Sequence, residues 1–202
     1  LAVAWSLQAA AVAWIAGRLA VPRLRWLVTP LALLVAVRLL VNPAVLIYPI
    51  GPLPLLNWLG YGYGIPAVSL AAAAWRSRRD GDTALANLLE GVAMAIGAVW
   101  ITLEIHHAFH PEQLMVGPST LLEWGCLVIG WLLFALALEA AGRRAPGTTL
   151  ARGAIAMALV AMAGALVGPG LLVNPLFTNE PVDGPVLVNA LLVAYALPGA
   201  LM

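Results

Sequence analysis

The chain has 202 residues, of which 63% are hydrophobic and 9% are charged, and its formal net charge is +1. A soluble domain carries about 25% charged residues, so this composition excludes an ordinary soluble globular protein. The net charge of +1 gives no indication of a nucleic-acid partner, and the single cysteine, Cys126, excludes an intrachain disulfide. We therefore expect an all-α, polytopic transmembrane helical bundle whose partners are membrane lipids and not nucleic acid.

Runs of about 20 apolar residues, the length of a helix that crosses the hydrocarbon core, recur along the chain. In chain order we expect seven spans, at roughly residues 2–20, 25–41, 55–75, 84–106, 119–141, 149–168 and 185–202. In the sixth run, Gly164 and Gly168 have the GxxxG spacing that predicts close contact with another helix. We treat residues 1–202 as a single transmembrane region and expect it to be a fragment of a longer chain.

Arginine is concentrated in alternate connections between these runs. Nine of the ten arginines lie in the first, third and fifth connections, and the other three connections contain none. The positive-inside rule assigns arginine-rich connections to the cytoplasm. The sequence therefore predicts a multi-pass protein of the bacterial inner membrane, with the segments around Pro43, His110 and Pro175 on the outer side.

Two segments of the chain repeat each other. Residues 39–66 align without a gap with residues 171–198, and 11 of the 28 positions are identical. Self-similarity at a fixed spacing indicates a duplicated structural unit. Four expected spans, an even number, separate the two copies. The sequence therefore predicts a parallel four-span repeat, with copy one at about residues 38–169 and the start of copy two at about 170–202.

All three histidines lie in one segment, LEIHHAFHPEQ at residues 103–113, at the outer end of the fourth expected span. On a helix, His106 and His110 are four residues apart and share a face, and Glu104 and His107, three apart, share another. Histidine beside carboxylates suits acid–base chemistry near neutral pH. Two other interpretations of this segment remain. It could form a two-histidine metal site completed by a nearby glutamate, or a hydrated polar cluster at the membrane edge.

Ionisable groups inside apolar runs are costly, and they face a partner or a wet cavity. Glu104 and Glu123 lie in the outer halves of the fourth and fifth expected spans, and Arg38 lies in the outer half of the second. We expect Arg38 to pair with one of these glutamates, either as a packing lock or as part of a polar cavity. Asn57 matches Asn189 in the repeat, which favours an interhelical hydrogen bond over ligand contact.

These patterns define the candidate site and two competing functions. The candidate residues are Glu104, His107 and Glu123 for catalysis, and Arg38, Asn57, His106 and His110 for binding. No phosphate-binding loop, catalytic serine elbow or zinc-protease signature accompanies them. The sequence therefore does not identify a cofactor or a metal ion. The first function is an envelope enzyme or a lipid- or glycan-binding protein with an outward-facing polar site. The second is a transporter or a non-catalytic membrane scaffold.

Several ordered motifs resemble a known family. RLLVNP at residues 38–43, PLLNWLGYGYGIPA at 54–67, LEIHHAFH at 103–110 and PSTLLEW at 118–124 follow one another along the chain. This order resembles the large predicted membrane proteins grouped as domain of unknown function 2339. The resemblance implies a long chain with many spans, so the rest of that chain is an expected partner. It assigns no catalytic residue.

Overall fold

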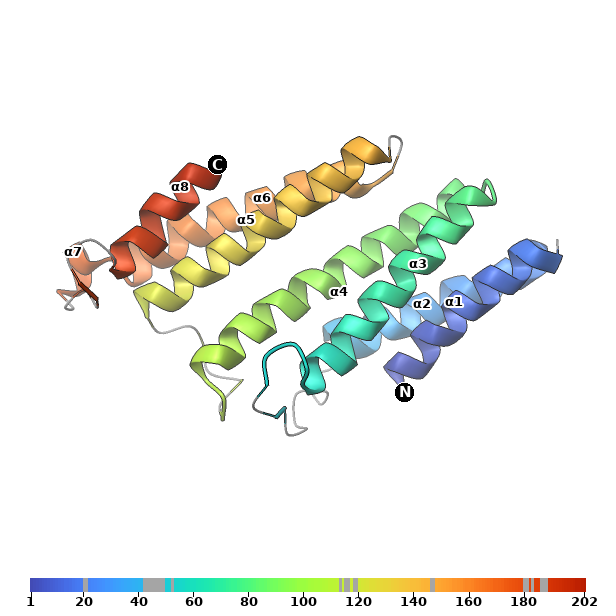
Figure 1. Ribbon diagram of the computed structural model, residues 1–202, viewed down its shortest axis with the longest axis horizontal. Helices are drawn as coiled ribbons and strands as arrows, with labels where there is room; N and C mark the ends of the chain where they lie inside the picture. Colours follow the sequence, from blue (N-terminus) through green and yellow to red (C-terminus); the bar gives the residue numbers. More distant parts are fainter. Residues whose placement is uncertain are drawn as a thin grey trace. The chain divides into compact units, whose positions relative to one another are not determined.

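The computed structural model describes residues 1–19, 22–41, 50–51, 53–112, 114, 117, 120–145, 148–179, 182, 184–185 and 189–202 (Figure 1). Every regular element within these ranges is helical, and no strand occurs among them. This confirms the predicted all-α class. The Asn-Pro segment expected at the outer side near Pro43 lies outside the described residues, as do the repeat positions Asn42, Pro49 and Pro181.

The helices follow one another with few other elements between them. In chain order they are α1 (Ala2–Leu19), η1 (Pro22–Leu24), α2 (Arg25–Ala36), η2 (Val37–Val41), η4 (Gly60–Gly64), α3 (Ile65–Arg79), α4 (Thr83–Phe109), α5 (Leu121–Arg144), α6 (Leu150–Val167), η5 (Gly168–Leu172), α7 (Pro175–Thr178), η6 (Leu192–Ala196) and α8 (Leu197–Leu201). The element η1 is a 3₁₀ turn, and η2, η4, η5 and η6 are π-helical turns.

The chain forms two compact units, Leu1–Trp100 and Ile101–Met202, and the boundary between them falls inside α4. In the first unit α1 packs against both α2 and α3. In the second unit α5 packs against α6 along its length and also contacts η6 and α8 (Figure 1). The last nine residues of α4 belong to the second unit.

Four helices of the described chain are long and apolar enough to cross a membrane: Ala2–Leu19, Thr83–Phe109, Leu121–Arg144 and Leu150–Thr178. At 1.5 Å per residue, helices of about 20 residues match the hydrocarbon thickness of about 30 Å. These four coincide with the first, fourth, fifth and sixth expected spans. At the other three positions the structure places α2 with η2, η4 with α3, and η6 with α8. These helices are shorter, or they carry arginines in their last turn.

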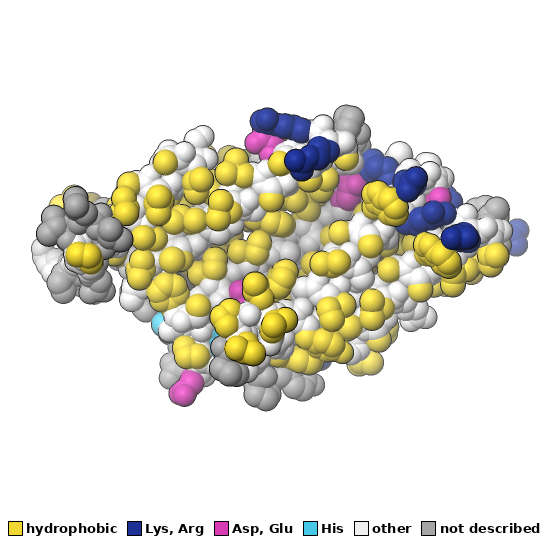
Figure 2. All heavy atoms as spheres, in the orientation of Figure 1, with side chains coloured by type: hydrophobic (Ala, Val, Ile, Leu, Met, Phe, Trp, Pro, Cys, Tyr) yellow, Lys and Arg dark blue, Asp and Glu magenta, His cyan; other side chains and the backbone are white. Residues whose placement is uncertain are grey.

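The outer surfaces of these helices are largely apolar. Hydrophobic side chains cover much of the face seen in Figure 2. Large hydrophobic residues are strongly exposed on several helices, among them Trp26, Val68, Ile155 and Leu166, each more than 60% exposed. Extended exposed apolar surface of this kind needs a membrane or another protein against it. Ile155 and Leu166 lie along α6, which is part of a helix of membrane-spanning length, so the lipid bilayer is the matching environment there.

Gly164 and Gly168 lie against aromatic rings of α5, which confirms the close contact that their spacing predicts. A Cβ atom added at Gly164 would overlap the ring of Trp131, and one added at Gly168 would overlap the ring of Trp124. Small residues of this kind let two membrane helices approach closely. Between them the helices bury a small core of Val128, Leu132 and Ala161.

Ion pairs join neighbouring helices at one end of the first unit. Arg25, at the start of α2, lies 3.8 Å from both Asp80 and Asp82, which follow α3. Arg78, in the last turn of α3, lies 2.8 Å from Glu90 of α4. The first two arginine-rich connections of the chain therefore lie at the same end of this unit.

Two short segments of the chain make the same local hydrogen bonds. The side-chain oxygen of Asn57 accepts from the Gly60 backbone N–H at 2.9 Å, and that of Asn189 accepts from the Leu192 N–H at 3.2 Å. Each asparagine therefore caps the π-helical turn that follows it, η4 or η6. The interhelical hydrogen bond expected for Asn57 stays a prediction beside this local contact.

The tyrosines of the same two segments also correspond. The Tyr63 hydroxyl donates to the Leu39 carbonyl oxygen at 3.1 Å, and the Tyr195 hydroxyl donates to the Pro169 carbonyl oxygen at 2.6 Å. In each case the accepting carbonyl lies in an earlier π-helical turn, η2 or η5. Each tyrosine therefore ties the turn in which it lies to one that precedes it by more than 20 residues.

Candidate functional site

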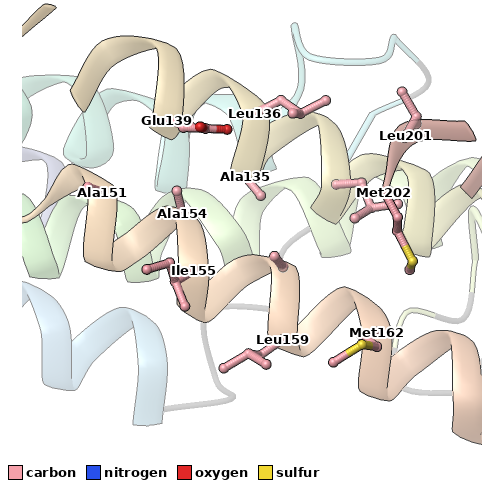
Figure 3. Close-up of a pocket in the computed structure, with 12 residues that line it drawn as sticks. Ala135, Leu136, Glu139, Ala151, Ala154, Ile155, Leu159, Met162, Leu201 and Met202 are labelled. Atoms are coloured by element: carbon pink, nitrogen blue, oxygen red, sulfur yellow. The ribbon is translucent and has the colours of Figure 1, made fainter. Parts of the chain in front are cut away.

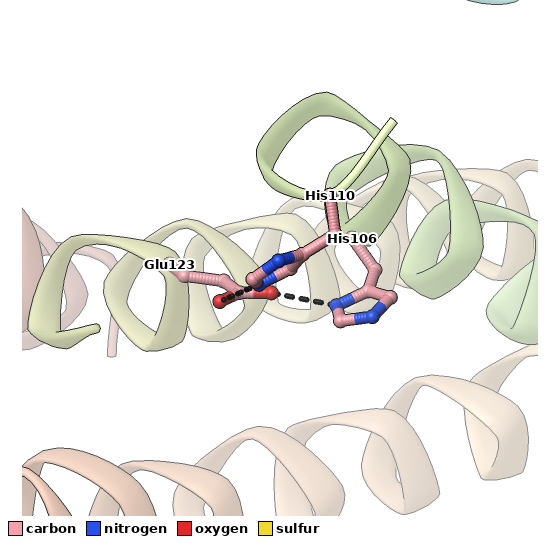
Figure 4. A group of neighbouring side chains, drawn as sticks. All are labelled: His106, His110 and Glu123. Carbon is pink, nitrogen blue, oxygen red and sulfur yellow. Dashed lines mark hydrogen bonds and ion pairs between the residues drawn. The ribbon is translucent and has the colours of Figure 1, made fainter. Parts of the chain in front are cut away.

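The second unit brings three ionisable side chains together where α4 ends and α5 begins. His106 lies in the last turn of α4, and His110 follows the helix directly. The His110 N–H donates to the His106 carbonyl oxygen at 2.8 Å, so the helical register continues through His110. Residues four apart share a face of a helix, and both imidazole rings therefore point toward Glu123 on α5 (Figure 4).

The start of α5 fixes the position of Glu123. Thr120 is the N-cap residue, and its hydroxyl oxygen accepts from the Glu123 N–H at 3.2 Å. A threonine followed three residues later by glutamate is a signature of a helix N-terminus. A carboxylate in the first turn is also stabilised by the positive end of the helix dipole. Thr120 was not among the predicted site residues, although this spacing would have identified it.

Each oxygen of Glu123 contacts a different histidine. His106 Nδ1 lies 2.6 Å from Oε1, and His110 Nε2 lies 3.0 Å from Oε2. The two ring centroids are 4.8 Å apart, with an angle of 41° between the ring planes. The Glu123 side chain is fully buried, the His106 side chain is 8% exposed and the His110 side chain is 21% exposed. The cluster is therefore inaccessible from outside at Glu123 and partly accessible at His110.

An ionised Glu123 determines which nitrogens of the two histidines carry protons. A carboxylate only accepts hydrogen bonds, so His106 donates from Nδ1 and His110 donates from Nε2. When His106 is neutral, its Nε2 then carries a lone pair. That atom is buried and has no hydrogen-bond partner among the described residues. The arrangement can accept a proton or a hydrogen bond from a bound group, or bind a metal ion.

Glu104 and His107 lie on the same stretch of α4 as the cluster. His107 is adjacent to His106 in sequence, so its side chain leaves the helix about 100° around the axis. It is 8% exposed and therefore buried. The structure brings together His106 and His110, which were expected to bind, and Glu123, which was expected to be catalytic. The catalytic assignment of Glu104 and His107 stays a prediction.

Arg38 and Asn57 belong to the first unit. Arg38 lies in η2 and borders a cavity of about 120 Å³ together with Leu39, Trp58 and Tyr61. The rings of Trp58 and Tyr61 lie 5.4 Å apart, centroid to centroid. The predicted ion pair between Arg38 and Glu104 or Glu123 joins residues of different units, and it stays a prediction.

A larger cavity, of about 550 Å³, lies between α5, α6 and α8 (Figure 3). Its walls are almost entirely apolar, with Glu139 at one place in the lining. The nearest lining residue on α5, Leu132, is nine residues from Glu123, or about 14 Å along the helix. This cavity is separate from the histidine cluster and offers no acid–base chemistry of its own beyond Glu139.

Long apolar helices, exposed hydrophobic sides and arginines near helix ends define a multi-pass α-helical membrane protein. The family model described as "Predicted membrane protein (DUF2339)" matches residues 1–202, and the chain belongs to this family. The resemblance inferred from the ordered motifs is thereby confirmed. No curated protein and no solved structure matches the chain.

Proposed function

We propose that this protein spans the bacterial inner membrane and carries a polar, outward-facing site that binds or processes the headgroup of a lipid or an envelope glycan. The observation that carries the proposal is the buried cluster of His106, Glu123 and His110. Ionisable groups at membrane helices are costly and usually serve a function. This cluster also lies at the end of a span, where a headgroup can reach it.

The cluster suits acid–base work on a hydroxyl or phosphate-bearing headgroup. Glu123 accepts from His106 Nδ1 and so holds the imidazole in one tautomer, with Nε2 able to accept a proton. His110 is the most exposed of the three side chains and is the point of contact for an incoming group. In this proposal Glu123 orients His106, and His106 and His110 contact the headgroup.

The distribution of arginines supports the proposed orientation. In the first unit, the arginine-rich ends of α2 and α3 meet through Arg25, Asp80 and Asp82. In the second unit, Arg143 and Arg144 end α5, whereas Glu123 lies in its first turn. The helix of 24 residues separates these ends by about 35 Å. Under the positive-inside rule, which assigns arginine-rich ends to the cytoplasm, this separation supports an outward-facing histidine cluster.

The proposed architecture has seven spans and a parallel repeat. Helices lie at all seven expected positions, and among the described residues four of them meet the length and composition of a span by themselves. The repeat is supported by matching local structure 132 residues apart. The turns Gly60–Gly64 and Leu192–Ala196 begin at aligned positions, follow aligned asparagines and contain aligned tyrosines.

A non-catalytic scaffold is the second candidate, and one observation favours it. Both oxygens of Glu123 are already bound to histidines, and its side chain is fully buried. Such a cluster can act as a lock between α4 and α5 within the second unit, with no ligand at all. Breaking a buried ion pair by removing one partner costs about 3–5 kcal/mol, so a lock would show itself in stability.

The two candidates differ in what His106→Gln does to the purified full-length protein. We would measure the lipids and glycans retained in lipid nanodiscs by mass spectrometry, and the unfolding temperature of the same samples. The headgroup site predicts that His106→Gln loses a retained class of molecule that Glu112→Gln, an exposed control, keeps. The scaffold predicts unchanged retention and a lower unfolding temperature, and this result would overturn the proposed function.

A further inference from the structure

We infer that His106, His110 and Glu123 together bind a divalent transition metal ion, for which Zn²⁺ is the best match. This inference goes beyond the proposed headgroup site and does not depend on it. One potential ligand atom from each of the three residues lies within 4.8 Å of the others. The three residues come from two helices of the same unit, so their spacing is set by helix packing.

The chemistry of the three ligands matches zinc. Imidazole nitrogens and a carboxylate oxygen are ligands that Zn²⁺ uses, and two histidines with one glutamate is a known catalytic zinc set. Soft sulfur ligands, which would favour copper(I) or iron–sulfur chemistry, are not part of this group. An oxygen-only set, which Mg²⁺ and Ca²⁺ prefer, is also not what the cluster offers.

The distances are close to those that a tetrahedral ion requires. Bonds of about 2.0–2.1 Å in tetrahedral geometry place neighbouring ligand atoms about 3.3 Å apart. The two N···O distances here are 2.6 Å and 3.0 Å. The three ligand atoms all lie within 4.8 Å of one another. An ion between them would require the two short N···O contacts to lengthen and any wider separation to shorten, by about 1 Å or somewhat more.

Burial distinguishes this cluster from a chance surface group. Glu123 is fully buried and His106 is more than nine-tenths buried. A bound cation would compensate the charge of the buried carboxylate, and a histidine binds a metal ion in its neutral form. The partial exposure of the His110 side chain gives an ion access to the cluster. Three protein ligands with one open position is the arrangement of a catalytic zinc site.

The test is metal binding by the full-length protein, purified with a tag that contains no histidine. After treatment with a chelator and removal of the chelator, the protein would be titrated with Zn²⁺ and, separately, with Co²⁺. Bound metal would be counted by mass spectrometry of the desalted protein. We expect one ion per chain, and an absorption spectrum of the Co²⁺ form that is typical of tetrahedral nitrogen and oxygen ligands.

Matched variants show whether the ion lies at this cluster. We expect His106→Gln and Glu123→Gln each to weaken Zn²⁺ binding by at least 100-fold, whereas His107→Gln and Glu112→Gln retain it. Less than stoichiometric metal in the wild-type protein would overturn the inference, as would full binding by the His106→Gln and Glu123→Gln double variant. If these variants fail to fold, the wild-type Co²⁺ spectrum decides, because an octahedral oxygen-ligand spectrum also overturns it. Lipid retention is measured separately, so failure here leaves the proposed function untouched.

Discussion

At the scale of single residues, Glu123 is the centre of the polar cluster, and its surroundings explain why it can be buried. Two imidazoles bind its two oxygens, and the Thr120 cap places it in the first turn of α5. A buried carboxylate without such partners would be strongly unfavourable. The three side chains are therefore interdependent, and removal of the carboxylate leaves two histidines without their shared acceptor.

We expect Glu123→Ala to lower the free energy of unfolding by about 3 kcal/mol, because it removes the acceptor of one buried and one partly buried hydrogen bond. The matched control is Glu112→Ala, since Glu112 is exposed, and its effect should stay within about 0.5 kcal/mol. Reversible unfolding in detergent micelles or nanodiscs measures both values. Equal effects of the two substitutions would contradict the buried role of Glu123.

Two neighbouring tyrosines give a second comparison at this scale. Tyr63 is 2% exposed and donates to the Leu39 carbonyl oxygen, whereas Tyr61 is 50% exposed. We expect Tyr63→Phe to lower the free energy of unfolding by about 1 kcal/mol, the usual value of one buried hydrogen bond. Tyr61→Phe keeps the ring beside Trp58 and should change little. A chemical unfolding series of the two variants in the same detergent tests the difference.

At the scale of helices, close approach of α6 to α5 depends on glycines. A Cβ atom at Gly168 would overlap the indole ring of Trp124, whereas a Cβ atom at Gly91 of α4 would meet nothing within 4 Å. We expect Gly168→Ala to cost about 1–3 kcal/mol through overpacking. Gly91→Ala should stabilise by about 0.5–1 kcal/mol, because alanine favours a helix more than glycine does. Opposite signs in thermal unfolding are the expected result, and equal signs would contradict this packing.

The positions of the long helices could be predicted from the sequence, because an apolar run long enough to cross a bilayer has few other stable conformations. The expected span at residues 84–106 is α4, Thr83–Phe109, and the one at residues 119–141 is α5, Leu121–Arg144. The π-helical turns were not predicted. They depend on one additional residue in a helical turn, which the pattern of apolar residues does not reveal.

The candidate site was predicted only in part. The four-residue spacing of His106 and His110 indicates that they share a face of a helix. Which glutamate meets them depends on how α5 is rotated against the end of α4. Trp131 Nε1 donates to the Thr102 hydroxyl oxygen at 2.9 Å across these helices. A single sequence does not specify such pairing between helices, and for that reason Glu104 and Glu123 were both expected at the site.

At the scale of the whole molecule, the proposed orientation can be tested in cells. The chain has a single cysteine, so the substitution Cys126→Ser gives a cysteine-free variant into which new cysteines can be introduced for labelling. In that background we expect Gly117→Cys, between α4 and α5, to react with a membrane-impermeant maleimide in intact spheroplasts. Thr148→Cys, between α5 and α6, should react only after the membrane is opened. The reverse pattern would contradict the positive-inside assignment.

The π-helical turn η4 has a consequence for how the chain tolerates changes in length. A π-helical turn holds one residue more than an α-helical turn, because its hydrogen bonds join residues five apart instead of four. Deletion of the exposed Tyr61 would let η4 close as an ordinary turn, with the later part of α3 unrotated. Deletion of the exposed Ala72, within α3, would rotate every later residue by about 100° and remove Ala73, Ala74 and Ser77 from their buried positions. We therefore expect the continuous helix formed by η4 and α3 to tolerate deletion of Tyr61 and to lose its packing when Ala72, eleven residues later, is deleted.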